Sequence, residues 1–166
     1  MGLFSFLKRK PESEETVVPA NGIKALAEGI LFEDDGIFLK WGSDPEAGKY
    51  YAKKEFRADR VIYLWGEKSI LGGLRLPFKT ICWHHKQHGD TRAFESLEFS
   101  LEGADAKDKF QELKDYIEPI LADPRVPEDI KQGDLLLEWR IKAVKISLSF
   151  FNKENPKVLL EIGWWL

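Results

Sequence analysis

The chain has 166 residues, of which 43% are hydrophobic and 32% are charged, and its formal net charge is −3 at pH 7. This composition is typical of a single globular domain and excludes a disordered chain. The one cysteine excludes an intramolecular disulfide, and no apolar run reaches the roughly 18 residues of a membrane-spanning helix. We therefore expect a cytoplasmic protein.

Residues 1–10, MGLFSFLKRK, form a short amphipathic segment in which apolar side chains precede three cations. An export signal carries its charges first, and the myristoylation pattern needs Ser or Thr where Phe6 stands. Residues 11–21 are polar and predict a tether, and residues 22–166 predict a single α+β domain. The segment suggests peripheral contact with the inner face of a membrane. The apolar residues that would make this contact are Leu3, Phe4, Phe6 and Leu7.

Alternating apolar residues predict strands through most of the domain. The Asp-Gly pair at 35–36 lies between two apolar runs and predicts a hairpin turn with positive φ at the glycine. Residues 61–71 and 74–76 predict a strand pair. We expect this pair to break at Gly66 and to end at Pro77.

One long amphipathic helix is predicted over about residues 105–121. Its apolar residues recur at helical spacing and form one stripe, and Asp105 is placed to cap its N-terminus. Pro119 should kink or end it. The stripe consists of Ala106, Phe110, Leu113, Ile117 and Leu121.

Three further strands are predicted after the helix. In residues 144–150, apolar residues alternate with Lys and Ser, so one face is buried and the other is wet, as in an antiparallel sheet. Strands with one helix between them, and no regular strand–helix alternation, indicate an α+β fold with a mainly antiparallel sheet.

Strands followed by an amphipathic helix resemble bacterial pleckstrin-homology-type domains. The matching residues are 61–65, 74–81, 97–103 and the helix through Leu121. This resemblance covers the central part of the chain and implies a module that binds phospholipid headgroups or a peptide at the membrane. The strands after Asp134 depart from the family, whose domain closes with the helix.

The stretch ICWHHKQH, residues 81–88, holds the only cysteine and all three histidines. On a strand, Cys82, His84 and His88 point to the same side, where they could bind zinc with one further ligand or a water. Cys82 could alternatively be a nucleophile with a histidine base. The third interpretation is an inert buried thiol beside solvent-facing histidines.

Charge is unevenly distributed along the chain. Residues 40–92 hold eleven basic and six acidic side chains, whereas residues 93–134 hold five basic and twelve acidic ones. Cations interleaved with aromatic residues suit phosphates, although the sequence pI of 5.7 disfavours nucleic acid as a partner. The basic residues predicted to bind are Lys49, Lys53, Lys54, Arg57 and Arg60.

Trp164 and Trp165 place adjacent indoles on opposite faces of the last strand, so one of them needs a cover or a partner. The sequence contains no phosphate loop, nucleophile elbow or His-Glu-x-x-His helix. We therefore expect a non-enzymatic protein that binds another protein. Its type resembles bacterial immunity proteins, which occlude a cognate toxin. The alternatives are the pleckstrin-homology-like module and a zinc-dependent enzyme built on Cys82, His84 and His88.

Overall fold

A computed structural model of the chain describes residues 23, 25–46, 52–83, 93–122, 124–127 and 132–164. The named elements in this part are nine strands and one helix, so the fold is broadly α+β with a mainly antiparallel sheet, as predicted. The strands are β1 (Gly29–Phe32), β2 (Ile37–Lys40), β3 (Lys53–Phe56), β4 (Arg60–Ile70), β5 (Leu74–Trp83), β6 (Ser96–Glu102), β7 (Leu135–Ile141), β8 (Val144–Phe151) and β9 (Lys157–Trp164). The helix is α2 (Ala106–Leu121).

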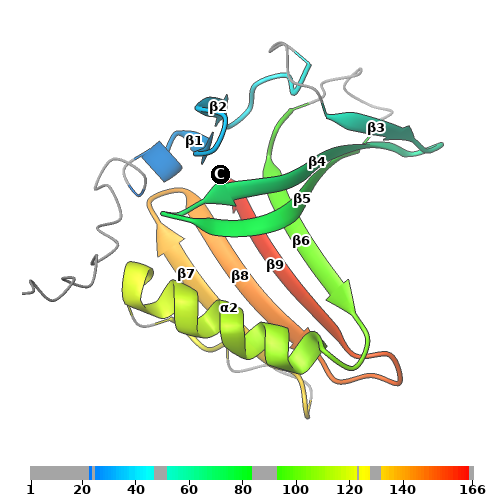
Figure 1. The fold of residues 1–166 in the computed structure, drawn as a ribbon, viewed down its shortest axis with the longest axis vertical. Coiled ribbons are helices and arrows are strands. Elements are labelled where there is room, and N and C mark those ends of the chain that lie inside the picture. The colour runs from blue at the N-terminus through cyan, green and yellow to red at the C-terminus, as the bar shows by residue number, and fades with distance from the viewer. Residues whose placement is uncertain are drawn as a thin grey trace, which may run out of the picture.

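Seven strands form one antiparallel sheet in the order β3-β4-β5-β6-β9-β8-β7. After β6, the chain passes through α2 to β7, which is an edge strand of the sheet. It then returns through β8 to β9, which pairs with β6 (Figure 1). Strands β1 and β2 form a separate antiparallel hairpin. Gly36 in its turn has φ +66°, which confirms the predicted hairpin chemistry.

Helix α2 is short, with 16 residues, so the prediction of a long helix is wrong. Gly103 ahead of it has φ +114°, and Ala122 behind it has φ +65°, so the backbone leaves the helical region at both ends. Asp105 occupies the N-cap position, but its side chain makes no capping hydrogen bond. No helix in the described residues has the length and apolar character needed to cross a bilayer.

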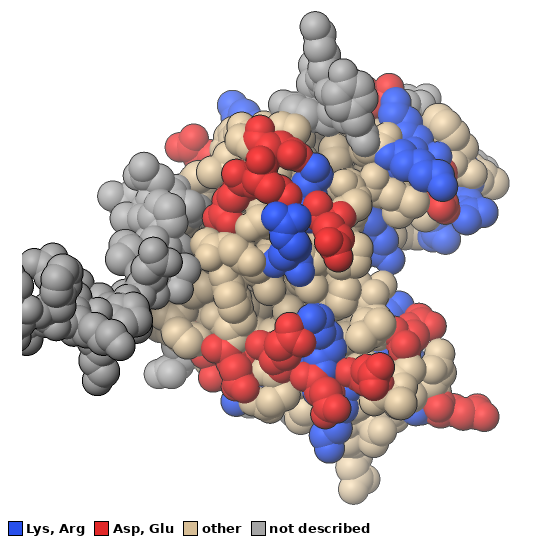
Figure 2. Space-filling view, in the orientation of Figure 1, with Lys and Arg blue, Asp and Glu red and all other residues tan. Residues whose placement is uncertain are grey.

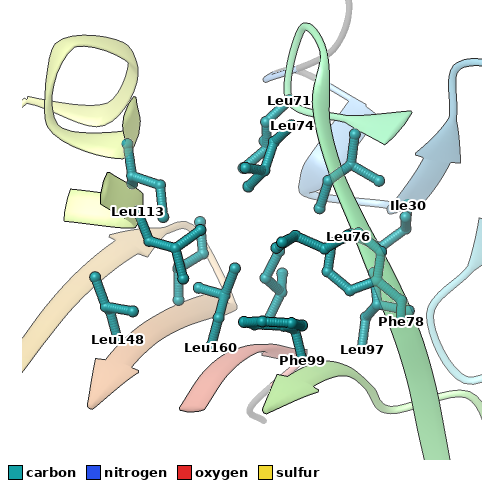
Figure 3. Close-up of a cluster of buried hydrophobic side chains, with 14 of the residues drawn as sticks. Ile30, Leu71, Leu74, Leu76, Phe78, Leu97, Phe99, Leu113, Leu148 and Leu160 are labelled. Carbon is teal, nitrogen blue, oxygen red and sulfur yellow. The ribbon is translucent and has the colours of Figure 1, made fainter. Parts of the chain in front are cut away.

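The core lies between α2, the β1–β2 hairpin and one face of the sheet. Leu113 of α2 faces Leu148 and Leu160 of the sheet, and Ile30 of the hairpin meets Phe78 of β5 (Figure 3). All five side chains are at most 1% exposed. Burial of this continuous apolar surface is the main stabilising contribution to the fold.

Strand β4 bends instead of breaking at Gly66. The register with β5 shifts between Leu64 and Gly66, and Gly66 has φ +72°, which is a β-bulge. Strand β5 also continues past Pro77 to Trp83, so the predicted strand end is wrong. Pro77 lacks an N–H, yet it lies opposite Glu67 in the β4–β5 register, and among the described residues β5 pairs with β6 only at Lys79 and Glu98.

The tip of the β4–β5 hairpin is held by the carboxylate of Glu33. Its oxygens accept hydrogen bonds from the backbone N–H of Gly72 at 2.6 Å and of Gly73 at 2.9 Å, and from the Ser69 hydroxyl at 2.9 Å. Charge-assisted hydrogen bonds are stronger than neutral ones. Glu33 therefore ties the β1–β2 hairpin to the main sheet.

We expect Glu33→Gln to lower the free energy of unfolding by about 1–3 kcal/mol, because an amide nitrogen cannot accept the hydrogen bonds that the carboxylate accepts. Chemical denaturation measures this loss. The control is Glu67→Gln, at an exposed position of the β4–β5 hairpin, which removes the same charge and should leave stability nearly unchanged. Equal stability of the two variants would contradict the role of Glu33.

Candidate functional site

One face of the sheet is left without a covering element in the described part of the chain, because α2 and the β1–β2 hairpin both lie on the other face. On the uncovered face, Ile62 and Leu64 of β4 and Ile81 of β5 are half-buried. Trp83, at the end of β5, is 49% exposed. These four residues form an apolar strip, which we call the open strip. Only Trp83 of the four is exposed, and an exposed aromatic side chain beside partly exposed apolar ones is compatible with an interaction site.

A groove opens beside the open strip because β6 starts away from β5. The backbone of Phe94, just before β6, pairs with a different segment: its N–H donates to Ser43 O at 2.7 Å, and its C=O accepts from the Gly42 N–H at 2.8 Å. β5 and β6 therefore share only the pair Lys79–Glu98. The space between them is a groove of about 280 Å³.

Three glutamates give the groove its charge. Glu95 and Glu98 come from the β6 side and Glu161 from β9. The complete lining is Ile81, Trp83, Glu95, Ser96, Glu98, Glu161, Gly163 and Trp164. Of the three glutamates, only Glu98 has an ion-pair partner among the described residues, namely Lys79, whose Nζ lies 4.0 Å from Glu98 Oε2. The groove is therefore acidic, and within the part of the chain that the structure describes Glu95 and Glu161 have no ion-pair partner.

Glu98 is a half-buried carboxylate on the groove floor. Burial raises the pKa of Glu98, and repulsion from Glu161 raises it further, whereas Lys79 and Lys157 lower it. Glu161 is directly opposite Glu98 in the β6–β9 register. Two like charges at this spacing repel each other, so a cation bound between them would be stabilised.

Trp83 forms an aromatic wall of the groove. The guanidinium of Arg60 lies 4.7 Å from the centre of the indole ring, within the range of a cation–π interaction. Arg60 and Trp83 are also opposite each other in the β4–β5 register, so strand pairing holds this contact in place. The indole is therefore held at the mouth of the groove while half of it stays exposed.

The predicted zinc ligands are only partly described. Cys82 is buried on the core side of β5, and its Sγ lies 3.5 Å from Ala93 O. His84 and His88 lie outside the described residues, so the zinc site stays a prediction. Within the described residues, no group of three His, Cys, Asp or Glu side chains is placed to hold a metal ion.

The predicted basic site falls on β3 and the start of β4, where Lys and Arg side chains gather (Figure 2). Lys54 pairs with Glu46 at 3.1 Å, and Arg57 pairs with Glu55 at 3.0 Å. Arg60 lies 3.8 Å from Asp59. Lys53 is exposed, and Lys49 lies outside the described residues. Neighbouring carboxylates thus reduce the positive charge that a phosphate would meet.

Of the two terminal tryptophans, Trp164 is half-buried and packs against the core. Its indole lies close to Gly42, where an added Cβ would meet Trp164 at 3.4 Å. Trp165, and the N-terminal residues Leu3, Phe4, Phe6 and Leu7, lie outside the described residues.

Sequence reasoning did not find the groove. Alternation places Glu98 on the wet face of its strand, but Trp83, Glu98 and Glu161 come together only through the strand order. The chain matches no protein-family model, and it matches no curated protein and no solved structure either. Function must therefore be inferred from the chemistry of the groove.

We expect Glu98→Gln to be more stable than the parent protein at pH 7. The folded-state pKa of Glu98 lies above its ordinary value of 4.5, so the folded state binds the proton more tightly than the unfolded chain, and the stability from this group is lost as pH rises through the folded pKa. A neutral amide avoids that loss. The gain should be about 2–4 °C in Tm, the shift that about 1 kcal/mol produces in a chain of this size.

Thermal unfolding between pH 4 and pH 8 tests this expectation. The advantage of Glu98→Gln should disappear below about pH 4.5, where the carboxyl is protonated in both states. Glu112→Gln, at an exposed position of α2, serves as the control for the loss of one negative charge. A Glu98→Gln variant that is less stable than the parent protein at pH 7 would show that attraction to Lys79 outweighs the cost of burial.

Proposed function

We propose that this chain is a non-catalytic binding protein that holds a cationic segment of a partner protein on the open face of its sheet. The observation that carries the proposal is the groove between β5 and β6, where Glu95 and Glu161 have no ion pair with any described residue. A cation entering the groove gains attraction from these carboxylates. It also relieves the repulsion between Glu98 and Glu161.

The size of the groove supports a side chain as its occupant. Its volume of about 280 Å³ lies just below the range of about 300–1,000 Å³ that is typical of pockets for drug-sized ligands. The open strip beside it offers Ile62, Leu64 and Ile81 to an apolar neighbour of the cation. A segment that carries one apolar and one cationic side chain would engage both surfaces.

The finer form of the proposal is an inhibitor that acts in the cytoplasm by occluding its partner, as bacterial immunity proteins occlude toxins. Its support is electrostatic. The chain has a net charge of −3, and an acidic surface steers association with a cationic protein. Occlusion requires only a surface that covers the partner, which suits a sheet face that presents carboxylates beside apolar side chains.

A short cationic peptide tests the proposal without knowledge of the partner. We expect a five-residue peptide that alternates Leu with Lys or Arg to shift the backbone amide signals of Ser96 and Gly163 in NMR spectra of the full chain. The double variant Glu98→Gln, Glu161→Gln should weaken the affinity at least tenfold, because it removes both floor carboxylates. The dissociation constant from the titration measures this change.

The matched control is Glu112→Gln, Asp115→Asn, which removes two charges from the exposed side of α2. It should change the affinity less than twofold at 150 mM salt, where distant charges are screened. Equal weakening by both double variants would show attraction by overall charge and contradict a groove site. Binding to anionic lipid vesicles with no binding to the peptide would favour the pleckstrin-homology-like alternative instead.

A further inference from the structure

We infer that the side chain which the groove accepts from the partner is arginine and not lysine. This inference rests on the proposed function, since it names the cation that the groove would bind. It depends on the shape of two groups: the flat indole of Trp83 on one wall and the opposed carboxylates of Glu98 and Glu161 on the floor. A planar guanidinium matches both groups, whereas a compact ammonium matches neither wall nor floor as closely.

The wall already binds one guanidinium within the chain. Arg60 lies 4.7 Å from the Trp83 ring centre, yet the tryptophan remains 49% exposed. Trp83 also lines the groove. Arg stacks on aromatic rings by both cation–π attraction and planar contact, whereas Lys offers only a point charge. A partner arginine would therefore stack on the part of the indole that Arg60 leaves open.

The floor offers acceptors to a fork of donors. Glu98 and Glu161 are directly opposite each other on neighbouring antiparallel strands, so their Cβ atoms are about 5 Å apart. A guanidinium has five N–H donors in one plane and can donate to both carboxylates at once. Lys79 Nζ already lies beside Glu98 and donates to Ser100 Oγ at 3.4 Å, so either cation meets it there, and the wider fork of a guanidinium can still donate to Glu161.

Desolvation also favours arginine. The Glu98 side chain is only 18% exposed, so a cation that reaches it loses part of its water shell. Guanidinium is hydrated more weakly than ammonium, so it loses less hydration free energy on entering such a site. Stacking, forked hydrogen bonding and weaker hydration therefore act in the same direction.

The test compares two peptides, acetyl-Leu-Arg-Leu amide and acetyl-Leu-Lys-Leu amide, by NMR titration of the full chain. We expect the arginine peptide to bind about fivefold to tenfold more tightly. Trp83→Leu should reduce this ratio to below twofold, because it keeps an apolar wall and removes the ring. Trp83→Phe should keep an intermediate ratio. Thermal unfolding of both variants verifies that they fold.

The outcomes distinguish a failure of the arginine preference from a failure of the proposed function. Equal or tighter binding of the lysine peptide would overturn the preference for arginine and leave the proposed function standing. An arginine preference that survives Trp83→Leu would overturn the stacking argument. If neither peptide binds, both the inference and the proposed function fail. A preference for arginine of fivefold or more that is lost in Trp83→Leu supports both the inference and the proposed function.

Discussion

The pairing of Phe94 with residues 42 and 43 is the constraint on which the rest of the site depends. An unpaired buried backbone group is costly, so the N–H and C=O of Phe94 must find partners, and they find them in Ser43 and Gly42. The stacking of the Phe94 ring on Trp41, with ring centres 4.9 Å apart, fixes the same contact through side chains. The contacts of Phe94 with residues 41–43 thus anchor the β1–β2 hairpin to the main sheet. They also hold the start of β6 away from β5, which opens the groove.

The edges of the sheet are protected, so its face is more accessible than its edges to the partner that we propose. Edge strands present unpaired backbone groups, and proteins blunt them with charged side chains, short strands or a covering segment. Strand β3 has only four residues and begins with Lys53 and Lys54. At the other edge, Arg125 makes a two-bond bridge to Glu138 of β7. A partner that added a strand would meet these obstacles, whereas one that lies on the face would not.

Local sequence patterns predicted the two faces of the strands but not the contacts between them. Alternation around Leu97 and Phe99 correctly places both residues in the core and leaves Glu98 on the other face. Gly36 could be predicted because an Asp-Gly turn demands positive φ within two residues. The strand end predicted at Pro77 is wrong because the pairing of β5 with β4, which continues through Pro77 opposite Glu67, is a long-range property. The amphipathic stripe predicted a helix over about residues 105–121, and the helix spans Ala106–Leu121, so only its description as long is wrong.

The same distinction explains why the basic stretch looked like a site and the groove did not. From the sequence alone, Lys54 and Arg57 are expected to be available to a phosphate. In the fold, Glu46 and Glu55 form ion pairs with them. Composition likewise counts Glu98 and Glu161 as ordinary solvated carboxylates, but strand order places them opposite each other on a partly buried floor. Neutralisation of a charge depends on its neighbours in space, and those neighbours come from distant parts of the chain. A charge that folding places opposite a like charge is therefore a better indicator of a binding surface than a charge that is merely frequent in the sequence.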